Sequence, residues 1–124
     1  MDNQEMKVTV ALVGSRDFTN YEMFKTKVKQ YTKNLGNFCI VSGGAKGADT
    51  LAKQYAIEFG HEIIEFLAEW DKYGKSAGFK RNITIVEACT HLIAFQINDS
   101  KGTQHSIDLA REAGKPVRVV KISK

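Results

Sequence analysis

The chain has 124 residues, of which 43% are hydrophobic and 26% charged, with one proline, two cysteines and a formal net charge of +4. This composition predicts one domain, residues 1–124, that folds without disulfides or metals, and it excludes a long disordered segment. No apolar run approaches the roughly 18 residues of a membrane span, and the polar start "MDNQEMK" is not a signal peptide. We therefore expect a cytoplasmic protein with a flexible tail at residues 1–6 and, from its charge, an anionic partner.

The first half of the chain alternates buried strands with amphipathic helices. The run "KVTVALVGS", residues 7–15, is typical of a strand covered on both faces. Next, Thr19 and Glu22 form a possible capping box for a helix that ends before Gly36. "NFCIVSG" then predicts a second strand, followed by a second helix that ends at Gly60. The apolar faces of the two helices are Phe24, Val28, Tyr31 and Leu35, and Leu51, Ala52, Tyr55, Ala56 and Phe59.

The second half continues the alternation. "HEIIEF" predicts a third strand, and a loop over residues 69–82 separates it from a third helix with Phe79, Ile83 and Val86 as its core stripe. "THLIAFQI", "GTQHSIDLAREAG" and "PVRVVKI" predict a fourth strand, a fourth helix and a fifth strand. The pattern indicates an α/β fold: a doubly wound, mainly parallel five-stranded sheet of order 3-2-1-4-5 with helices on both faces.

Three unusual loops follow strands 1, 2 and 4 of this predicted sheet: "GSRDF", "SGGAKGAD" and "NDSKGT". Ligands of doubly wound sheets bind at the carboxyl ends of the strands, where the connections diverge to opposite faces. We therefore expect the three loops to converge on one crevice.

The loop from Ser42 to Asp49 has the composition of an anion cradle. Glycines let backbone amides approach a ligand, and the helix start behind them carries unpaired N–H groups, with Lys46 as a counter-charge. It is not a Walker A sequence, which argues against ATP hydrolysis. The alternative is that the glycines only make a tight turn and let the helix pack closely on the sheet.

Two charged groups nearby allow two interpretations each. Asp49 either interacts favourably with the helix dipole or holds a ribose hydroxyl or an arginine. Arg16 either binds an anion in bidentate fashion or forms a loop-fixing network with Asp17.

The segment 69–82 interleaves aromatic and cationic residues. Trp70 and Tyr73 can stack on a base while Lys75 and Arg81 meet phosphates, although the two aromatics could instead cover an end of the sheet. Arg81 lies off the predicted core stripe and is the strongest ligand candidate. The three histidines show no metal-ligand spacing, so we expect no metal or other cofactor beyond a nucleotide ligand.

With these residues in view, the chain resembles the SLOG superfamily, the Rossmann-like group of Smf/DprA and LOG proteins, and within it the YspA-type family of small single-domain bacterial and phage proteins. The resemblance covers nearly the whole chain. It rests on "GSRDF" at 14–18, "SGGAKGAD" at 42–49, the tryptophan, "YGKSAG" and "RN" between 70 and 82, and "KGT" at 101–103.

The resemblance implies binding of a nucleotide or nucleotide-derived ligand, often in homodimers. It also implies two competing functions: single-stranded DNA binding, as in DprA, and hydrolysis of nucleoside 5′-monophosphates, as in LOG phosphoribohydrolases. Arg81 matches the LOG arginine, but Ser106 stands where LOG enzymes have a glutamate, and glycosidic cleavage calls for a carboxylate. If the chain is an enzyme, Arg81 and Asp49 are its candidate catalytic residues, with Asp99 or Asp108 as weaker substitutes.

We therefore expect first a binding module, and as alternatives a LOG-like hydrolase or a DprA-like single-stranded DNA binder. The predicted ligand-contacting residues are Gly14, Ser15, Arg16, Asp17, Ser42, Gly43, Gly44, Ala45, Lys46, Gly47, Asp49, Trp70, Tyr73, Lys75, Arg81, Asn82, Ser100, Gly102 and Thr103.

Overall fold

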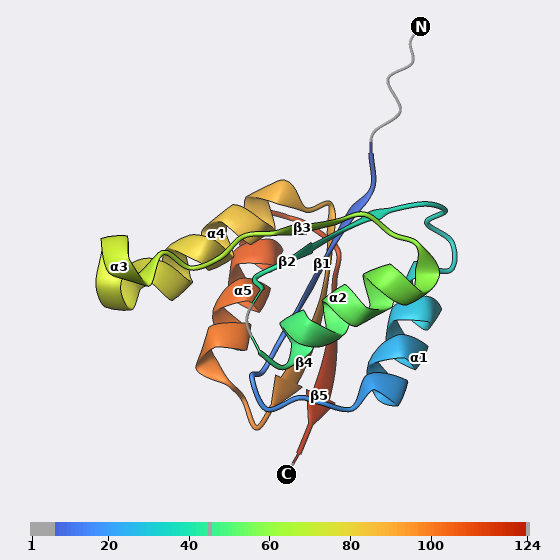
Figure 1. Cartoon of the computed structure of the whole chain (residues 1–124), viewed down its shortest axis with the longest axis horizontal. Helices are drawn as coiled ribbons and strands as arrows, with labels where there is room; N and C mark the ends of the chain where they lie inside the picture. Colours follow the sequence, from blue (N-terminus) through green and yellow to red (C-terminus); the bar gives the residue numbers. More distant parts are fainter. Residues whose placement is uncertain (1–6, 45, 124) are drawn as a thin grey trace, which may run out of the picture.

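The computed structural model describes residues 7–44 and 46–123, so the predicted tail at residues 1–6 and the predicted ligand contact Ala45 lie outside it. Five strands alternate with helices along the chain, as the sequence pattern predicts (Figure 1). The strands are β1 (Thr9–Gly14), β2 (Cys39–Ser42), β3 (Ile63–Glu65), β4 (His91–Ile97) and β5 (Val117–Ile122). The helices are α1 (Tyr21–Thr32), α2 (Ala48–Phe59), α3 (Trp70–Tyr73), the 3-10 turn η1 (Gly74–Ser76), α4 (Ala77–Ala88) and α5 (Lys101–Glu112).

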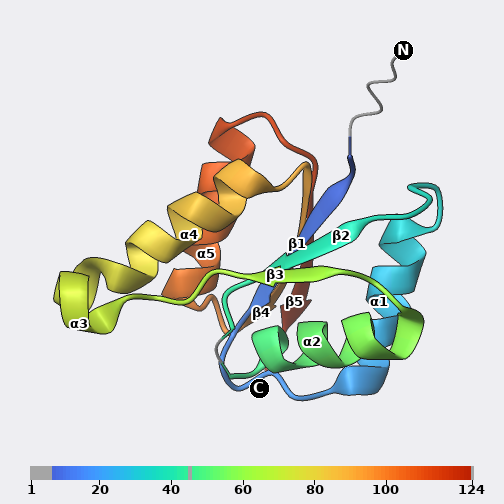
Figure 2. The same cartoon turned by 45° about the horizontal axis from the view of Figure 1, so that its top comes forward.

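The sheet confirms the predicted topology. Its order is β3-β2-β1-β4-β5 and every pairing is parallel, with Val13 opposite Ala94 and Ser42 opposite Glu65. Helices α1 and α2 cover one face, and α4 and α5 cover the other (Figures 1 and 2). Since all strands are parallel, their carboxyl ends share one edge of the sheet, and the loops after β1, β2 and β4 meet there.

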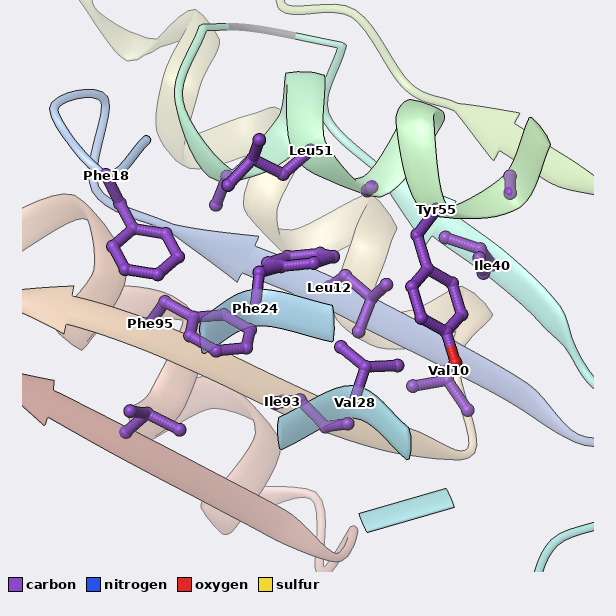
Figure 3. Packing of buried hydrophobic residues seen from close by; sticks show 14 of the residues in the cluster. Val10, Leu12, Phe18, Phe24, Val28, Ile40, Leu51, Tyr55, Ile93 and Phe95 are labelled. Carbon is purple, nitrogen blue, oxygen red and sulfur yellow. The ribbon is translucent and has the colours of Figure 1, made fainter. Parts of the chain in front are cut away.

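A hydrophobic core fills each side of the sheet. On the α1–α2 side, Phe24 packs against Phe95 with ring centroids 4.8 Å apart and meets Tyr55 edge-on at 6.3 Å (Figure 3). On the α4–α5 side, smaller residues such as Val13, Ile85 and Ile107 interlock. The aliphatic strand residues thus lie between two helical layers, which explains why the strands are nearly continuous apolar runs.

The ends of the helices differ in one respect from expectation. The N-cap of α1 is Asn20, whose Oδ1 accepts a hydrogen bond of 3.0 Å from the Met23 amide, so the predicted Thr19–Glu22 capping box is wrong. A cap needs a side-chain oxygen one residue before the first helical turn, and the helix starts one residue later than Thr19 would require. Gly60 ends α2 in the left-handed conformation, as predicted.

The segment 69–82 is not an irregular loop. It forms α3, η1 and the first half of α4, and α3 projects beyond the edge of the sheet (Figures 1 and 2). The predicted core stripe of α4 is confirmed for Val86, which is buried, but wrong for Phe79 and Ile83, which are 55% and 41% exposed. The buried face of α4 consists of Ala77, Asn82, Ile85 and Val86. A helix contacts its neighbours along one stripe, and here that stripe includes an asparagine that apolar periodicity does not reveal.

None of the helices in the described part of the chain has the length and apolar character that a bilayer-spanning segment requires.

Candidate functional site

A cavity of about 530 Å³, which we call the outer cavity, lies at the carboxyl ends of the strands. The loops after β1 and β2, the segment leading into α3, the start of α4 and the start of α5 all contribute to its wall. Its lining residues are Gly14, Arg16, Gly43, Gly44, Lys46, Asp49, Leu67, Ala68, Trp70, Lys75, Gly78, Phe79, Arg81, Asn82 and Gly102. The predicted convergence of the loops is therefore present in the structure.

A smaller hollow of about 230 Å³, the inner cavity, adjoins the outer one. The two share six lining residues, among them Arg16, Asp49 and Arg81. The inner cavity is lined by Val13, Gly14, Ser15, Arg16, Asp49, Arg81, Asn82, Ile85, Ser100, Gly102, Thr103 and Ser106. Arg81 is thus one of the residues that line both cavities.

The lining of the outer cavity combines charged and apolar side chains. Its described lining includes four cationic residues (Arg16, Lys46, Lys75 and Arg81) and one carboxylate, Asp49. The same cavity is lined by Leu67, Trp70 and Phe79, which are 65%, 59% and 55% exposed. A surplus of positive charge beside exposed aromatic rings suits a ligand with an anionic part and a flat apolar part.

Arg81 is held by two hydrogen bonds from different parts of the chain. Its Nη1 donates to the backbone oxygen of Gly43 at 3.2 Å, and its Nε donates to Oδ1 of Asn82 at 3.1 Å. Asn82 is buried, and its Nδ2 donates to the backbone oxygen of Gly102 at 3.4 Å. Arg81 therefore connects the glycine-rich loop to the beginning of α5.

The glycine-rich loop passes too close to its neighbours for side chains at all three of its glycines, since a Cβ on Gly44, whose φ is +68°, would collide with the Leu67 side chain. A Cβ atom on Gly43 would lie 2.5 Å from Nη1 of Arg81 and 3.0 Å from Oδ2 of Asp49. A Cβ on Gly47, whose φ is +74°, would collide with the backbone of Ser15 and Arg16. The two interpretations of the loop therefore apply to different glycines. Gly47 allows close packing of backbone on backbone, whereas Gly43 leaves room for the guanidinium of Arg81, which lines the cavity.

The serine and threonine side chains that were predicted to contact the ligand form hydrogen bonds within the loops. Ser15 Oγ accepts a hydrogen bond of 2.9 Å from the Ile97 amide, and Ser42 Oγ accepts one of 3.4 Å from the Gly44 amide. The hydroxyls of Ser100 and Thr103 lie 3.3 Å apart at the start of α5. Ser15, Ser100 and Thr103 also line the inner cavity, whereas Ser42 is fully buried and lines neither cavity.

Besides Ser42, three of the predicted contacts, Asp17, Gly47 and Tyr73, line neither cavity. Asp17 is exposed. Tyr73 lines a neighbouring depression that shares Leu67 and Arg81 with the outer cavity, and Nζ of Lys80 and Nζ of Lys72 lie 4.8 Å and 5.2 Å from its ring centroid. Of the two aromatics in the segment 69–82 that were candidates for stacking on a base, the structure brings only Trp70 to the outer cavity.

The position of the LOG glutamate lies inside the site. Ser106 is 2% exposed and lines the inner cavity. Asp99 instead pairs with Lys121 at 2.8 Å, which holds the pKa of that carboxyl below its usual value, and Asp108 accepts a hydrogen bond of 2.9 Å from Gln104. Asp49 is thus the carboxylate that the described lining of both cavities provides.

Four lining residues of the outer cavity were not predicted: Leu67, Ala68, Gly78 and Phe79. His105 was also dismissed, yet its Nδ1 lies 3.2 Å from Nδ2 of Asn82 and its ring meets Phe79 edge-on at 4.6 Å. The sequence holds one usable signal for Phe79, its place two residues before Arg81 in a segment rich in aromatics and cations. Nothing in the sequence marks His105.

The fold and the two cavities define a Rossmann-like α/β protein with a candidate anion site at the carboxyl ends of its strands. The model of the YspA, cpYpsA-related SLOG family matches residues 8–73, more than half of the chain, so the chain belongs to that family. This confirms the resemblance inferred from the loop motifs.

Two known proteins are similar to this chain. The Gene 61 protein of Mycobacterium phage D29 is 39% identical over 84 residues, which cover 63% of this chain and 67% of that protein. The second is DNA processing protein A from Helicobacter pylori, whose structure was described for its unique single-stranded DNA binding mode. That structure matches 90% of this chain with a TM-score of 0.67 and 22% identity. This chain spans 64% of that protein, and at this identity the likeness shows the shared fold.

Proposed function

We propose that this protein binds a nucleotide or a nucleotide-derived ligand in the outer and inner cavities. The observation that carries the proposal is that one cavity is lined both by four cationic residues, Arg16, Lys46, Lys75 and Arg81, and by the aromatic side chains of Trp70 and Phe79. Nucleotides combine phosphates with a flat base, and this arrangement matches both parts. A volume of about 530 Å³ is also within the common size range of small-molecule sites, roughly 300–1,000 Å³.

The backbone supports a place for the phosphates. Helices α2 and α5 begin at the cavities, and their first amides point toward the carboxyl edge of the sheet, where a helix N-terminus attracts anions. In this proposal the phosphates rest on amides of the glycine-rich loop at Gly43, Gly44, Lys46 and Gly47, and on those of Gly102 and Thr103. Lys46 and Arg81 neutralise their charge, and Asp49 holds a ribose hydroxyl or orients Arg81.

A thermal-shift screen tests this proposal directly. Mononucleotides, dinucleotides, cyclic nucleotides and ADP-ribose are each added to the purified protein, and a ligand at 100 times its Kd adds about 2.7 kcal/mol to the free energy of unfolding. The same screen is run on Arg81→Gln and, as a matched control, on the distant exposed Arg118→Gln. A shift in the wild type and the control but not in Arg81→Gln supports the site, whereas no shift with any probe contradicts it.

Single-stranded DNA binding is the second candidate. The similarity to DNA processing protein A favours it, and so does the exposed row of Lys72, Tyr73 and Lys80 just outside the outer cavity, because single strands bind to cations and stacked aromatics. The test is oligonucleotide binding at several salt concentrations. A steep fall of log Kobs with log salt concentration reports that several phosphates are neutralised and their counterions released, which a mononucleotide site cannot produce.

Hydrolysis of a glycosidic bond ranks below binding because Ser106 replaces a carboxylate at the inner cavity. Under that hypothesis Arg81 grips the substrate and Asp49 supplies the carboxylate. If the wild type releases free base from a nucleoside monophosphate and Arg81→Ala does not, the hydrolase hypothesis is favoured over binding alone. A homodimer and a cytoplasmic location remain predictions.

A further inference from the structure

A chain of hydrogen bonds leads from the outer cavity to α5 through the side chain of Asn82. Nε of Arg81 donates to Oδ1 of Asn82, while Nδ2 of Asn82 lies 3.2 Å from Nδ1 of His105 and 3.4 Å from the backbone oxygen of Gly102. Asn82 is only 8% exposed, so water does not readily replace these partners. The three side chains therefore depend on one another.

The partners of Asn82 determine where the proton of His105 lies. A guanidinium can only donate and a backbone carbonyl can only accept, so Oδ1 of Asn82 must face Arg81 and its NH₂ group must face Gly102. The same NH₂ group faces His105, whose Nδ1 must then accept. A neutral imidazole in this arrangement carries its hydrogen on Nε2.

We propose that His105 is a positioning residue: its neutral ring holds Arg81 in place for an anionic ligand through Asn82, and its protonation weakens ligand binding. A protonated imidazole has a hydrogen on both nitrogens, so Nδ1–H would face the NH₂ group of Asn82. If the amide of Asn82 turns over to accept from His105, its NH₂ group then faces Nε–H of Arg81. The proposal rests on the proposed function, since Arg81 is the guanidinium that would meet the ligand.

The surroundings of His105 allow this response. The ring packs between α4 and its own helix, with the Phe79 ring edge-on at 4.6 Å. The charged groups that flank it are Arg81 on α4, and Lys101 and Asp108 one turn away on α5, where Asp108 is engaged with Gln104.

The first experiment needs no ligand. Nitrogen-15 NMR of the wild-type protein is expected to show His105 with its hydrogen on Nε2 at pH 8. The Nε signal of Arg81 is expected to move between pH 8 and pH 5.5 together with the His105 signals, and to lose this movement in His105→Gln, which keeps an acceptor but cannot titrate. A hydrogen on Nδ1 of His105 at pH 8 overturns the proposal, and so does an Arg81 Nε signal whose movement with pH is the same in the wild type and in His105→Gln. If His105→Gln does not fold, the position of the hydrogen on the wild-type His105 ring at pH 8 tests the proposal by itself: Nε2 supports it and Nδ1 overturns it.

The second experiment measures binding of ADP-ribose by calorimetry at pH 8 and pH 5.5, because its pyrophosphate keeps its charge across this range. The affinity of the wild type is expected to be about tenfold lower at pH 5.5 than at pH 8, a loss equivalent to one hydrogen bond to a charged group. The affinity of His105→Gln is expected to fall much less. His91→Gln, at the far end of β4, is the control and should behave as the wild type. An equal loss in the wild type and His105→Gln overturns the proposal. If no nucleotide probe binds at pH 8, the proposed function fails, while the spectra still decide whether His105 positions Arg81.

Discussion

Nη1 of Arg81 donates a hydrogen bond of 3.2 Å to the backbone oxygen of Gly43, although the two residues are 38 positions apart in the chain. The bond joins α4 to the loop after β2 and fixes a guanidinium that lines both the outer and the inner cavity. A cation in this position can serve a ligand in either cavity.

Gly43→Ala is expected to weaken nucleotide binding with little loss of stability. The new Cβ would meet the end of the flexible Arg81 side chain, which can move away at low cost but then leaves its place in the cavity. Gly47→Ala is the matched variant, because its Cβ would meet backbone atoms at a positive φ. It is expected to lower the free energy of unfolding by about 1–3 kcal/mol. Urea unfolding and calorimetric titration separate the two effects, and a larger stability loss in Gly43→Ala would contradict this account.

Phe79→Ala is expected to weaken binding by about 1–3 kcal/mol if the ring stacks on a base. Its side chain is 55% exposed, so the free energy of unfolding should change much less than for a core phenylalanine. Ile83→Ala, one turn further along α4 and 41% exposed, does not line either cavity and is the control. Equal affinities of Phe79→Ala and Ile83→Ala would remove Phe79 from the site.

Asn20→Ala is expected to destabilise the protein by about 1 kcal/mol, the usual cost of losing an N-cap. The reason is the 3.0 Å hydrogen bond from the Met23 amide to its side chain. Thr19→Ala, one residue earlier, should stay within about 0.5 kcal/mol of the wild type. Chemical denaturation of both variants measures the difference, and a greater loss in Thr19→Ala would restore the capping box.

Stability is expected to fall above pH 10 partly because of Tyr21. Burial, together with a 2.6 Å hydrogen bond to Glu58, raises the pKa of Tyr21 well above its usual value. Folding therefore favours the neutral phenol: the contribution is complete below about pH 10, the ordinary pKa of an unfolded tyrosine, and is lost as the pH rises beyond it. Urea unfolding from pH 8 to 11 should show a steeper decline for the wild type than for Tyr21→Phe. Parallel declines would show that other groups account for the loss.

The sequence by itself determined the order of the elements and the topology of the sheet. Apolar, β-branched runs such as residues 7–15 are typical of strands buried on both faces, and helices between such strands favour parallel pairing with right-handed crossovers. The loops at the carboxyl edge could be predicted for the same reason. Arg16, Lys46, Lys75, Arg81 and Trp70 were predicted to contact the ligand, and the structure places them all around one cavity.

Only the tertiary structure decided which side chains face that cavity. The turn of α4 about its axis depends on how it packs against α5 and the sheet, and this places Phe79 at the cavity and Asn82 in the buried face. The partnership of Arg81 with Gly43, and that of Asn82 with His105, joins residues far apart in the chain. Local patterns carry the period of a helix, but they do not carry the hydrogen bonds that two elements form once packed together.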